Sequence, residues 1–368
     1  MKFANVEALR FTEYRRSDGA DIDDDTEAVA ADEGFRKNYY AFTSLAHDVE
    51  SGRLFCGTTN FAGDLLHAVD PATGAFESMG YSAVAEPLEI KIHRSLCVGP
   101  DGRVYGATSA LGGLNEMAES TGGRLFAFDP AAGTYDFLGA PAPHLYLQTI
   151  SLDGQRGMIY GMAYPSFEFF AFSLARREVV YRRYVGSIAH IGAVDPAGGY
   201  WGTWLGRRGR HCLFRYDGPA GKMAFHDTAF PTACRNLMYR GAGPIDAMID
   251  GGDGRLYVGH ESGELFGLDW RTGRLEYLAK PMPGQRLAGL AARDDGLLIG
   301  VGGSDWATFG FAYDRKTGAS EVLGGLVGAG GGPGCFRTHD CCLVGDHLFV
   351  GETDHPRRGC YLWRCRLR

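Results

Sequence analysis

Five polar side chains recur at nearly one matched position of a repeated sequence pattern. Each lies about nine residues before a glycine that begins an extended segment, the last two being displaced by one residue, and they are His93, Gln148, His190, Asp246 and Arg337. Apolar segments bury such groups only where hydrogen-bond partners or water receive them. Histidine exchanges protons near neutral pH, and arginine binds carboxylates. The set predicts a polar ring that could support acid–base chemistry beside a bound anion.

The glycines that define this position belong to a pattern that occurs seven times. Each copy has a glycine-led extended segment followed, after a variable loop, by an aromatic segment that often ends in Asp and Gly. The copies begin at Gly52, Gly102 and Gly254, and, less clearly, at Gly157, Gly199, Gly296 and Gly345. A period of 42 to 55 residues with short strands and turn residues is typical of a β-propeller. The chain is therefore predicted to be all-β, a seven-bladed β-propeller forming one domain over residues 1–368.

The N-terminal segment, about residues 1–38, is expected to be partly irregular. The final repeat ends at Arg368 with too little chain for a full set of strands. Native proteins avoid unpaired strand edges, because such edges promote aggregation. We therefore expect the segment around residues 6–14 to pair with the last blade and close the ring.

Loops on one face of the propeller are expected to contribute to the same site, because first strands begin and second strands end there. Tyr164 precedes a proline in one such loop, and Arg207 and Arg208 lie in a basic loop over residues 204–211. A loop of mixed charge covers residues 354–358. With Arg337 these loops predict an anion site at the mouth of the channel. Ordinary solvated charge around a polar, non-catalytic channel is the alternative.

The overall composition argues against several classes of partner. A net charge of −7 disfavours general nucleic-acid binding, which needs basic surface to displace counterions. The N-terminus lacks the apolar stretch of a signal peptide, and no segment approaches the roughly 18 apolar residues of a membrane-spanning helix. Nine cysteines without regular spacing fit a reducing compartment, which suggests a cytoplasmic location. An anionic saccharide stays compatible with a few local arginines.

The segment over residues 335–342 contains residue types that bind zinc. On a strand, Cys335, Arg337, His339 and Cys341 would share one side. Same-side neighbours lie about 7 Å apart, too far for two consecutive ones to meet one ion without a bend. Further ligands would have to come from other blades. We expect no required cofactor, with a zinc or calcium ion and the candidate ligands Cys335, His339 and Cys341 as the alternative.

The residue types at the mouth favour β-elimination over glycoside hydrolysis. Hydrolysis normally uses two carboxyl groups, and Asp246 is the only carboxylate at the matched position. β-Elimination from a uronic acid needs a cation or histidine beside the substrate carboxylate, and histidine or tyrosine as base and acid. Those residue types are present.

Several segments resemble the seven-bladed propeller polysaccharide lyases, which include the ulvan lyases and the lyases that cleave rhamnose from glucuronate. The segments are residues 91–96, 101–108, 160–165, 337–340, 351–356 and 361–363. The resemblance implies that His93 is a catalytic histidine and Tyr164 the catalytic tyrosine. The implied carboxylate-binding residues are Arg182 or Arg183, with Arg235 and Arg337 as further contacts.

One position departs from the pattern of that family. The family has a second histidine about twenty residues after the first, and Gly113 stands there in this chain. His190, His144 or Asn115 could substitute for it. The departure leaves altered or lost catalysis open.

The sequence thus supports three hypotheses. The first is a lyase acting on a uronate-containing saccharide, with catalytic residues His93, Tyr164 and His190. Its substrate-binding residues would be Gln148, Arg182, Arg183, Arg207, Arg208, Arg235, Asp246, Arg337 and His339. The second is a non-catalytic propeller that binds a saccharide or protein through the mouth. The third is a metal-assisted enzyme with His190, His339 and Asp246 around an ion.

Overall fold

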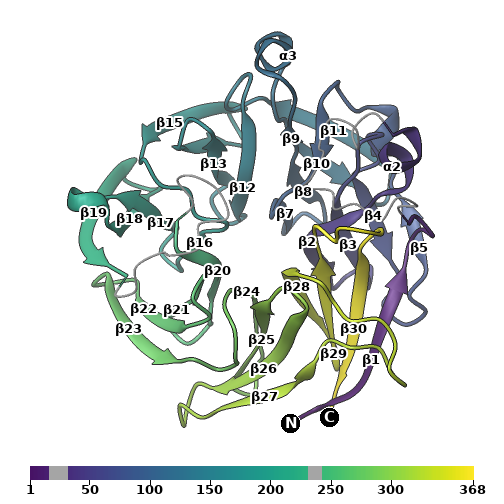
Figure 1. The fold of residues 1–368 in the computed structure, drawn as a ribbon. Coiled ribbons are helices and arrows are strands. Elements are labelled where there is room, and N and C mark those ends of the chain that lie inside the picture. Colours follow the sequence, from purple (N-terminus) through teal and green to yellow (C-terminus); the bar gives the residue numbers. More distant parts are fainter. Residues whose placement is uncertain (16–31, 231–242) are drawn as a thin grey trace.

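The computed structural model describes residues 1–15, 32–230 and 243–368. Seven antiparallel sheets are arranged around a central axis like the blades of a propeller (Figure 1). The first strands, which lie nearest the axis, contact those of the neighbouring blades all the way round the ring. The prediction of an all-β, seven-bladed β-propeller is confirmed.

The strands of each blade follow one another in sequence, from the axis outward. The first blade has β2 (Ala41–Asp48), β3 (Arg53–Thr59), β4 (Leu66–Val69) and β5 (Phe76–Ser78), extended by β6 (Glu89–Lys91) and β9 (Ser109–Ala110). The second has β7 (Leu96–Val98), β8 (Val104–Ala107), β10 (Leu125–Asp129) and β11 (Thr134–Gly139). The third has β12 (Tyr146–Asp153), β13 (Met158–Tyr164), β14 (Glu168–Ser173) and β15 (Glu178–Tyr184).

The remaining blades repeat this order. The fourth has β16 (Ala193–Val194), β17 (Gly199–Leu205), β18 (His211–Asp217) and β19 (Lys222–Ala229). The fifth has β20 (Ile245–Asp250), β21 (Leu256–His260), β22 (Leu265–Asp269) and β23 (Arg274–Ala279). The sixth has β24 (Leu287–Ala292), β25 (Leu297–Ser304), β26 (Ala307–Asp314) and β27 (Ser320–Gly325). The seventh has β28 (Thr338–Val344), β29 (His347–Glu352), β30 (Tyr361–Leu367) and β1 (Phe3–Arg10).

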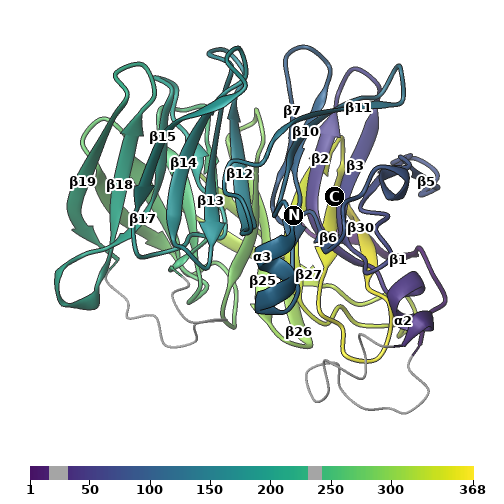
Figure 2. The ribbon, with the colours of Figure 1, turned by 90° about the horizontal axis from the view of Figure 1, so that it is seen from above.

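The two faces of the ring carry different connections. Short turns join first to second strands on one face, and six of the seven glycines of the sequence pattern have a positive φ there, between 58° and 98°. Glycine adopts this conformation without the steric cost that a side chain brings. The helices α2 (Glu33–Asn38) and α3 (Leu114–Glu119) lie on the opposite face, called the loop face below (Figure 2). Two 3₁₀ turns, η2 (Tyr81–Ala83) and η3 (Arg207–Gly209), complete the elements of the described residues.

Apolar clusters between neighbouring blades form the core. Ile299 of the sixth blade packs in one cluster with Val350 and Trp363 of the seventh. Phe55 of the first blade packs in another with Phe126 of the second. Burial of these side chains holds each blade against the next, which fixes the strands that line the channel.

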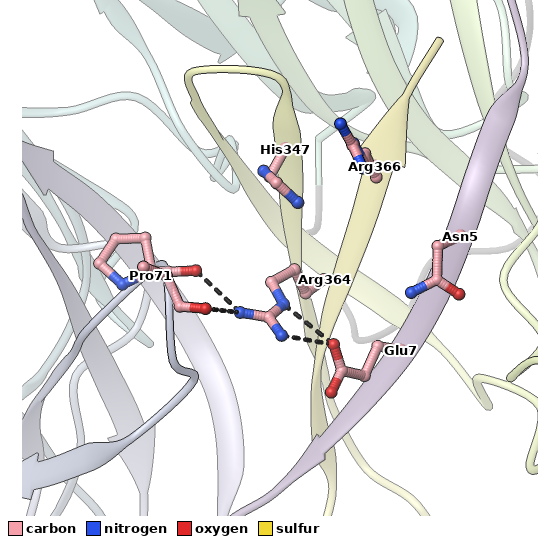
Figure 3. Close-up of a pocket in the computed structure, with 7 residues that line it drawn as sticks. Asn5, Glu7, Pro71, His347, Arg364 and Arg366 are labelled. Carbon is pink, nitrogen blue, oxygen red and sulfur yellow. Dashed lines mark hydrogen bonds and ion pairs between the residues drawn. The ribbon is translucent and has the colours of Figure 1, made fainter.

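The N-terminal strand closes the ring. β1 pairs antiparallel with β30 over Phe3 to Arg10 and so forms the outermost strand of the seventh blade. Arg364 of β30 donates to the carboxylate of Glu7 at 2.6 and 3.0 Å and to the carbonyl oxygens of Pro71 and Ala72 at 2.9 and 2.8 Å. Figure 3 shows this guanidinium between β1 and the turn after β4. One side chain thus connects the seventh blade, the N-terminal strand and the first blade.

Replacing Arg364 with alanine is expected to lower the free energy of unfolding by about 1–3 kcal/mol, because four hydrogen bonds across the closure are lost. The side chain of Arg366 on the same strand is 62% exposed, pairs with Asp346 and with no other described residue, and provides the control. Arg366→Ala should cost about 0.5 kcal/mol or less. Urea unfolding of both variants measures the difference, and equal losses would contradict the assigned role of Arg364.

Candidate functional site

In five blades the first strand contains an extra, unpaired residue, and these residues mark the height along the channel at which the polar ring lies. The pairing of first and second strands shifts register at one point in five blades, and the residues left between the paired positions are Thr43, Gln148, Asp246, Ala288 and His339. Such β-bulges bend a strand and redirect a side chain. In the seventh blade the matched residue is therefore His339, and the prediction that placed Arg337 there was wrong.

His93 and His190 reach the ring from irregular backbone. The apolar segments 89–98 and 187–195 do not form continuous strands: the first divides into β6 and β7, and only Ala193–Val194 of the second is a strand. Arg94 has a φ of 47°, which interrupts the strand. The Gln148 carbonyl oxygen lies 2.7 Å from His93 Nδ1, and the backbone N–H of His190 donates to the Ile245 carbonyl oxygen at 3.1 Å, so both residues are held across the channel.

Arg94, His339 and His93 form a chain of hydrogen bonds with a fixed direction. Arg94 Nε donates to His339 Nδ1 at 3.2 Å, and His339 Nε2 lies 3.0 Å from His93 Nε2. His93 Nδ1 lies 2.7 Å from the Gln148 carbonyl oxygen. Since a guanidinium only donates, His339 Nδ1 must accept and its Nε2 must carry the proton. His93 therefore accepts at Nε2 and donates at Nδ1, so both imidazoles are neutral.

The surroundings of these histidines oppose their protonation. Burial, with help from Lys91 and His190, holds the pKa of His93 well below its usual value. Burial and Arg94 do the same for the pKa of His339. Burial also lowers the pKa of His190, although Asp246 acts in the other direction. The native channel therefore keeps neutral imidazoles where an unfolded chain would take up protons.

This arrangement predicts loss of stability in mild acid. A histidine whose pKa is lowered on folding adds its full contribution to the free energy of unfolding above about pH 6.5. This contribution is lost as the pH falls below that value. Each such histidine adds a slope of up to about 1.4 kcal/mol per pH unit. The variant His339→Gln keeps an acceptor for Arg94 and should show a shallower loss. Thermal unfolding followed by circular dichroism from pH 8 to pH 5 measures both slopes, and identical slopes would contradict the interpretation.

His190 and Asp246 form a second unit beside the chain. His190 Nδ1 lies 2.8 Å from Asp246 Oδ1, and Arg286 holds the same carboxylate through Nε at 2.9 Å and a terminal nitrogen at 3.2 Å. Burial acts to raise the pKa of Asp246, but Arg286 and His190 outweigh it and hold that pKa well below its usual value. An ionised carboxylate only accepts, so His190 donates from Nδ1 and carries its lone pair on Nε2. Carboxylate-oriented histidines act as bases in this form.

Two guanidinium nitrogens beside this unit lack hydrogen-bond partners among the described residues. They are Arg94 Nη2 and Arg286 Nη1, and both atoms are buried. Arg94 Nη2 lies 3.7 Å from Asp246 Oδ1, too far for a hydrogen bond. Both arginines have a positive φ, 47° and 58°, a strained conformation that collects at functional sites. The unpaired donors provide a place for an oxyanion.

Tyr164 lies near the ring and is connected to it through another tyrosine. It ends β13 opposite Tyr146, with 6.4 Å between the ring centroids, and Tyr146 lies 6.1 Å from His93. Tyr164 is half-buried, which leaves part of it open to the loop face. The structure thus brings together His93, Gln148, His190, Asp246 and His339, with Tyr164 at their edge.

The structure does not bring the other predicted arginines to the ring. Arg182 and Arg183 lie on β15, the outermost strand of the third blade, where Arg182 donates to the Pro141 carbonyl oxygen. Arg207 and Arg208 are exposed in η3. Side chains of a fourth strand are farthest from the axis, which explains the error. Arg235 lies outside the described residues.

Arg337 belongs to the loop face instead of the ring. Its guanidinium pairs with Asp305 and Asp354. It therefore remains near the mouth, in a pocket described below.

The position of the expected second histidine lies away from the ring. Gly113 caps α3 and is exposed, with its N–H donating to Glu116 at 2.8 Å. Asn115 is exposed on the same helix, and His144 is exposed and bound to the Ser120 carbonyl oxygen. Of the three proposed substitutes, His190 alone reaches the ring.

The cysteines of residues 335–342 do not meet at an ion. Cys335 and Cys341 pack in the apolar cluster between the sixth and seventh blades, whereas His339 faces the channel because of the bulge. Within the described ranges, no group of three or more His, Cys, Asp or Glu side chains could hold a metal. The eight described cysteines are free. No helix in these ranges is long and apolar enough to cross a membrane.

Sequence reasoning missed Arg94 and Arg286. Both lie next to the matched position of their repeat, because Arg94 follows His93 and Arg286 precedes Leu287, which lies nine residues before Gly296. In the sequence alone, neither arginine can be distinguished from one on the surface, because its contacts come from other blades.

Comparisons with known proteins identify the fold only. No protein-family model and no curated protein matches the sequence. Among solved structures, the chain is similar to one assigned as the extracellular domain of a hybrid two-component system from B. thetaiotaomicron, with a TM-score of 0.58 and 12% identity. The likeness covers 97% of this chain and 39% of that protein. The resemblance to polysaccharide lyases gains no support here, and the fold is compatible with enzymatic and binding roles.

Proposed function

We propose that the chain is a carbon–oxygen lyase that cleaves a saccharide beside a uronic acid by β-elimination. The observation that carries the proposal is the His190–Asp246 pair next to unpaired guanidinium nitrogens of Arg94 and Arg286. A base beside two anion-binding donors is what proton removal next to a carboxylate requires.

Each group has one role in the proposed step. Arg94 and Arg286 bind the substrate carboxylate and stabilise the enolate-like charge that forms on it. His190 Nε2 takes the proton from the carbon next to the carboxylate, and Asp246 stabilises the resulting imidazolium. The electron pair then forms a carbon–carbon double bond and breaks the bond to the leaving oxygen. Tyr164 gives that oxygen a proton, and the products are an unsaturated uronate and a free hydroxyl group.

The carboxylates of the ring are poorly suited to hydrolysis of a glycosidic bond. Asp246 is already engaged by Arg286 and His190. Asp340 accepts from the backbone N–H groups of Leu45 and Cys341 at 2.8 and 2.9 Å. Hydrolysis needs a proton-donating acid and a second carboxylate directed at the substrate. The proposed elimination needs no such carboxyl pair, because Tyr164 donates the proton and His190 is the base.

His93 has a different role here from the one implied by the resemblance. Both of its ring nitrogens are engaged within the protein, and 3% of the residue is exposed. We therefore assign His93 and His339 to the positioning of Arg94. Proton removal is assigned to His190 because the Asp246 carboxylate orients its imidazole.

The direct test is turnover by the purified protein. Polymers and oligosaccharides that contain glucuronate, galacturonate, mannuronate or iduronate are incubated with the full chain. We expect at least one to give the ultraviolet absorbance of an unsaturated uronate, with matching products in mass spectrometry. No product from the whole panel would refute the proposal.

A second candidate function is saccharide binding without turnover. It is favoured by the low exposure of the ring, because 7% of His190 is exposed. Glycan binding that is unchanged in His190→Ala, together with no turnover by the wild type, would support this candidate over the lyase.

A further inference from the structure

We infer that a pocket on the loop face, between α2 and loops of the first, sixth and seventh blades, binds an uncharged sugar ring. The inference deepens the proposed function, on which it rests for the identification of the ligand as a saccharide. The uronate would occupy the channel, and a neutral sugar of the same chain would occupy this pocket.

The pocket has the size and lining of a ligand site. Its volume is about 420 Å³, within the range of small-molecule sites. Aromatic side chains from four separate parts of the chain line it, namely Phe35 of α2, Phe61 after β3, Trp306 between β25 and β26, and Phe336 before β28. A sugar ring presents an apolar C–H face that such rings can cover.

Trp306 is the main aromatic surface. The residue is 59% exposed, although exposed tryptophan is costly in water. Phe336 and His355 lie 4.9 and 5.2 Å away at interplanar angles of 66° and 82°, so neither stacks on the indole. The Trp306 backbone N–H donates to the Phe336 carbonyl oxygen at 2.7 Å, which holds the loop in place. The indole is thus fixed while it remains accessible.

The charged groups of the pocket favour a neutral ligand. Arg337 donates to both oxygens of Asp305 at 2.8 and 2.6 Å and to Asp354 at 3.1 Å. The guanidinium is thus already engaged by two carboxylates, so it is poorly suited to bind the carboxylate of a uronate. The two carboxylates are 43% and 45% exposed, so their oxygens remain accessible to accept from sugar hydroxyl groups.

A buried hydroxyl group in the lining also lacks a partner. Thr59 Oγ1 is buried and makes no hydrogen bond to any described residue. An unsatisfied buried polar atom costs about 1–3 kcal/mol, unless water or a ligand binds it. A sugar hydroxyl could donate to this atom or accept from it.

The pocket adjoins the channel. Thr59 pairs with Lys91 across β3 and β6, two residues before His93. Asp354 lies within electrostatic range of both Lys91 and Arg286, the residue that holds Asp246. A saccharide chain could therefore extend from the ring to the indole of Trp306.

Binding of simple glycosides tests the inference without turnover. Saturation-transfer NMR and tryptophan fluorescence are recorded with the methyl glycosides of glucose, galactose and mannose, each compared with its uronate. We expect at least one neutral glycoside to show binding that depends on Trp306, and its uronate to show several-fold weaker Trp306-dependent binding. Trp306→Ala should reduce the affinity for the neutral glycoside about tenfold or more. Tyr277→Ala, at a 55% exposed position on β23, is the matched control and should leave it unchanged.

The outcomes separate this inference from the proposed function. His190→Ala should keep glycoside binding, because it leaves the pocket intact. On a cleaved saccharide, Trp306→Ala should raise KM with little change in kcat. Glycoside binding that depends on Trp306, without turnover of any uronate polymer, would refute the proposed lyase activity and support the sugar-binding role of the pocket. Absence of neutral-glycoside binding, or binding unchanged in Trp306→Ala, would overturn the sugar-binding role of the pocket and leave the proposed lyase activity untouched.

Discussion

Asp246→Ala is expected to lower the free energy of unfolding by about 3–5 kcal/mol, because it leaves buried cations without their counter-charge. The carboxylate is 2% exposed and lies between Arg286, Arg94 and His190. Two guanidinium groups would then face each other inside the channel. A denaturant titration at neutral pH measures the loss.

The same strand supplies the control for this prediction. Asp250 ends β20, is exposed, and accepts one backbone N–H from Gly252 at 3.0 Å. Asp250→Ala should cost about 1 kcal/mol or less. A loss below about 1 kcal/mol in Asp246→Ala would show that water or rearrangement compensates the arginines, against the network described above.

His190→Ala is expected to reduce the rate of elimination by about 10²–10⁴-fold, the usual contribution of a general base. The effect should fall on kcat, because His190 acts on the reacting proton and the arginines still bind the carboxylate. Initial rates of unsaturated-uronate formation measure it on the polymer that the wild type cleaves.

His144→Ala is the control for the loss of a histidine. His144 is exposed on the loop face and contacts the Ser120 carbonyl oxygen. Its replacement should leave kcat within about twofold of the wild type, since it touches none of the ring. Full activity in His190→Ala would exclude His190 as the base, whatever the activity of His144→Ala.

The fold was predictable because its signal is repeated. Glycines with positive φ recur at the turns into the second strands, and such positions tolerate few other residues. Seven copies of one pattern allowed weak single segments to support one another. The polar ring followed from the same alignment, which placed His93, Gln148, His190 and Asp246 correctly.

Errors arose where the local geometry departs from a regular strand. The turn between β28 and β29 has two residues, whereas the corresponding turns of the first and third blades have four, so counting back from the glycine selected Arg337 instead of the bulged His339. The backbone at Arg94, with a φ of 47°, divides a segment that reads as one strand. The Asp246 network depends on contacts between residues 40 or more positions apart, such as Asp246 and Arg286. No pattern within one repeat encodes these contacts.

The pairing of β1 with β30 also imposes an order on synthesis. β1 leaves the ribosome before every other strand of the ring, and its partner leaves after all of them. During translation β1 therefore lacks its partner strand β30. Phe3 likewise lacks its packing surface, which is the sixth-blade backbone near Gly310 and Gly324. The seventh blade, and with it the complete channel, can form only after translation of β30. The polar ring in the channel is therefore complete, and able to bind a ligand, only after β1 has paired with β30.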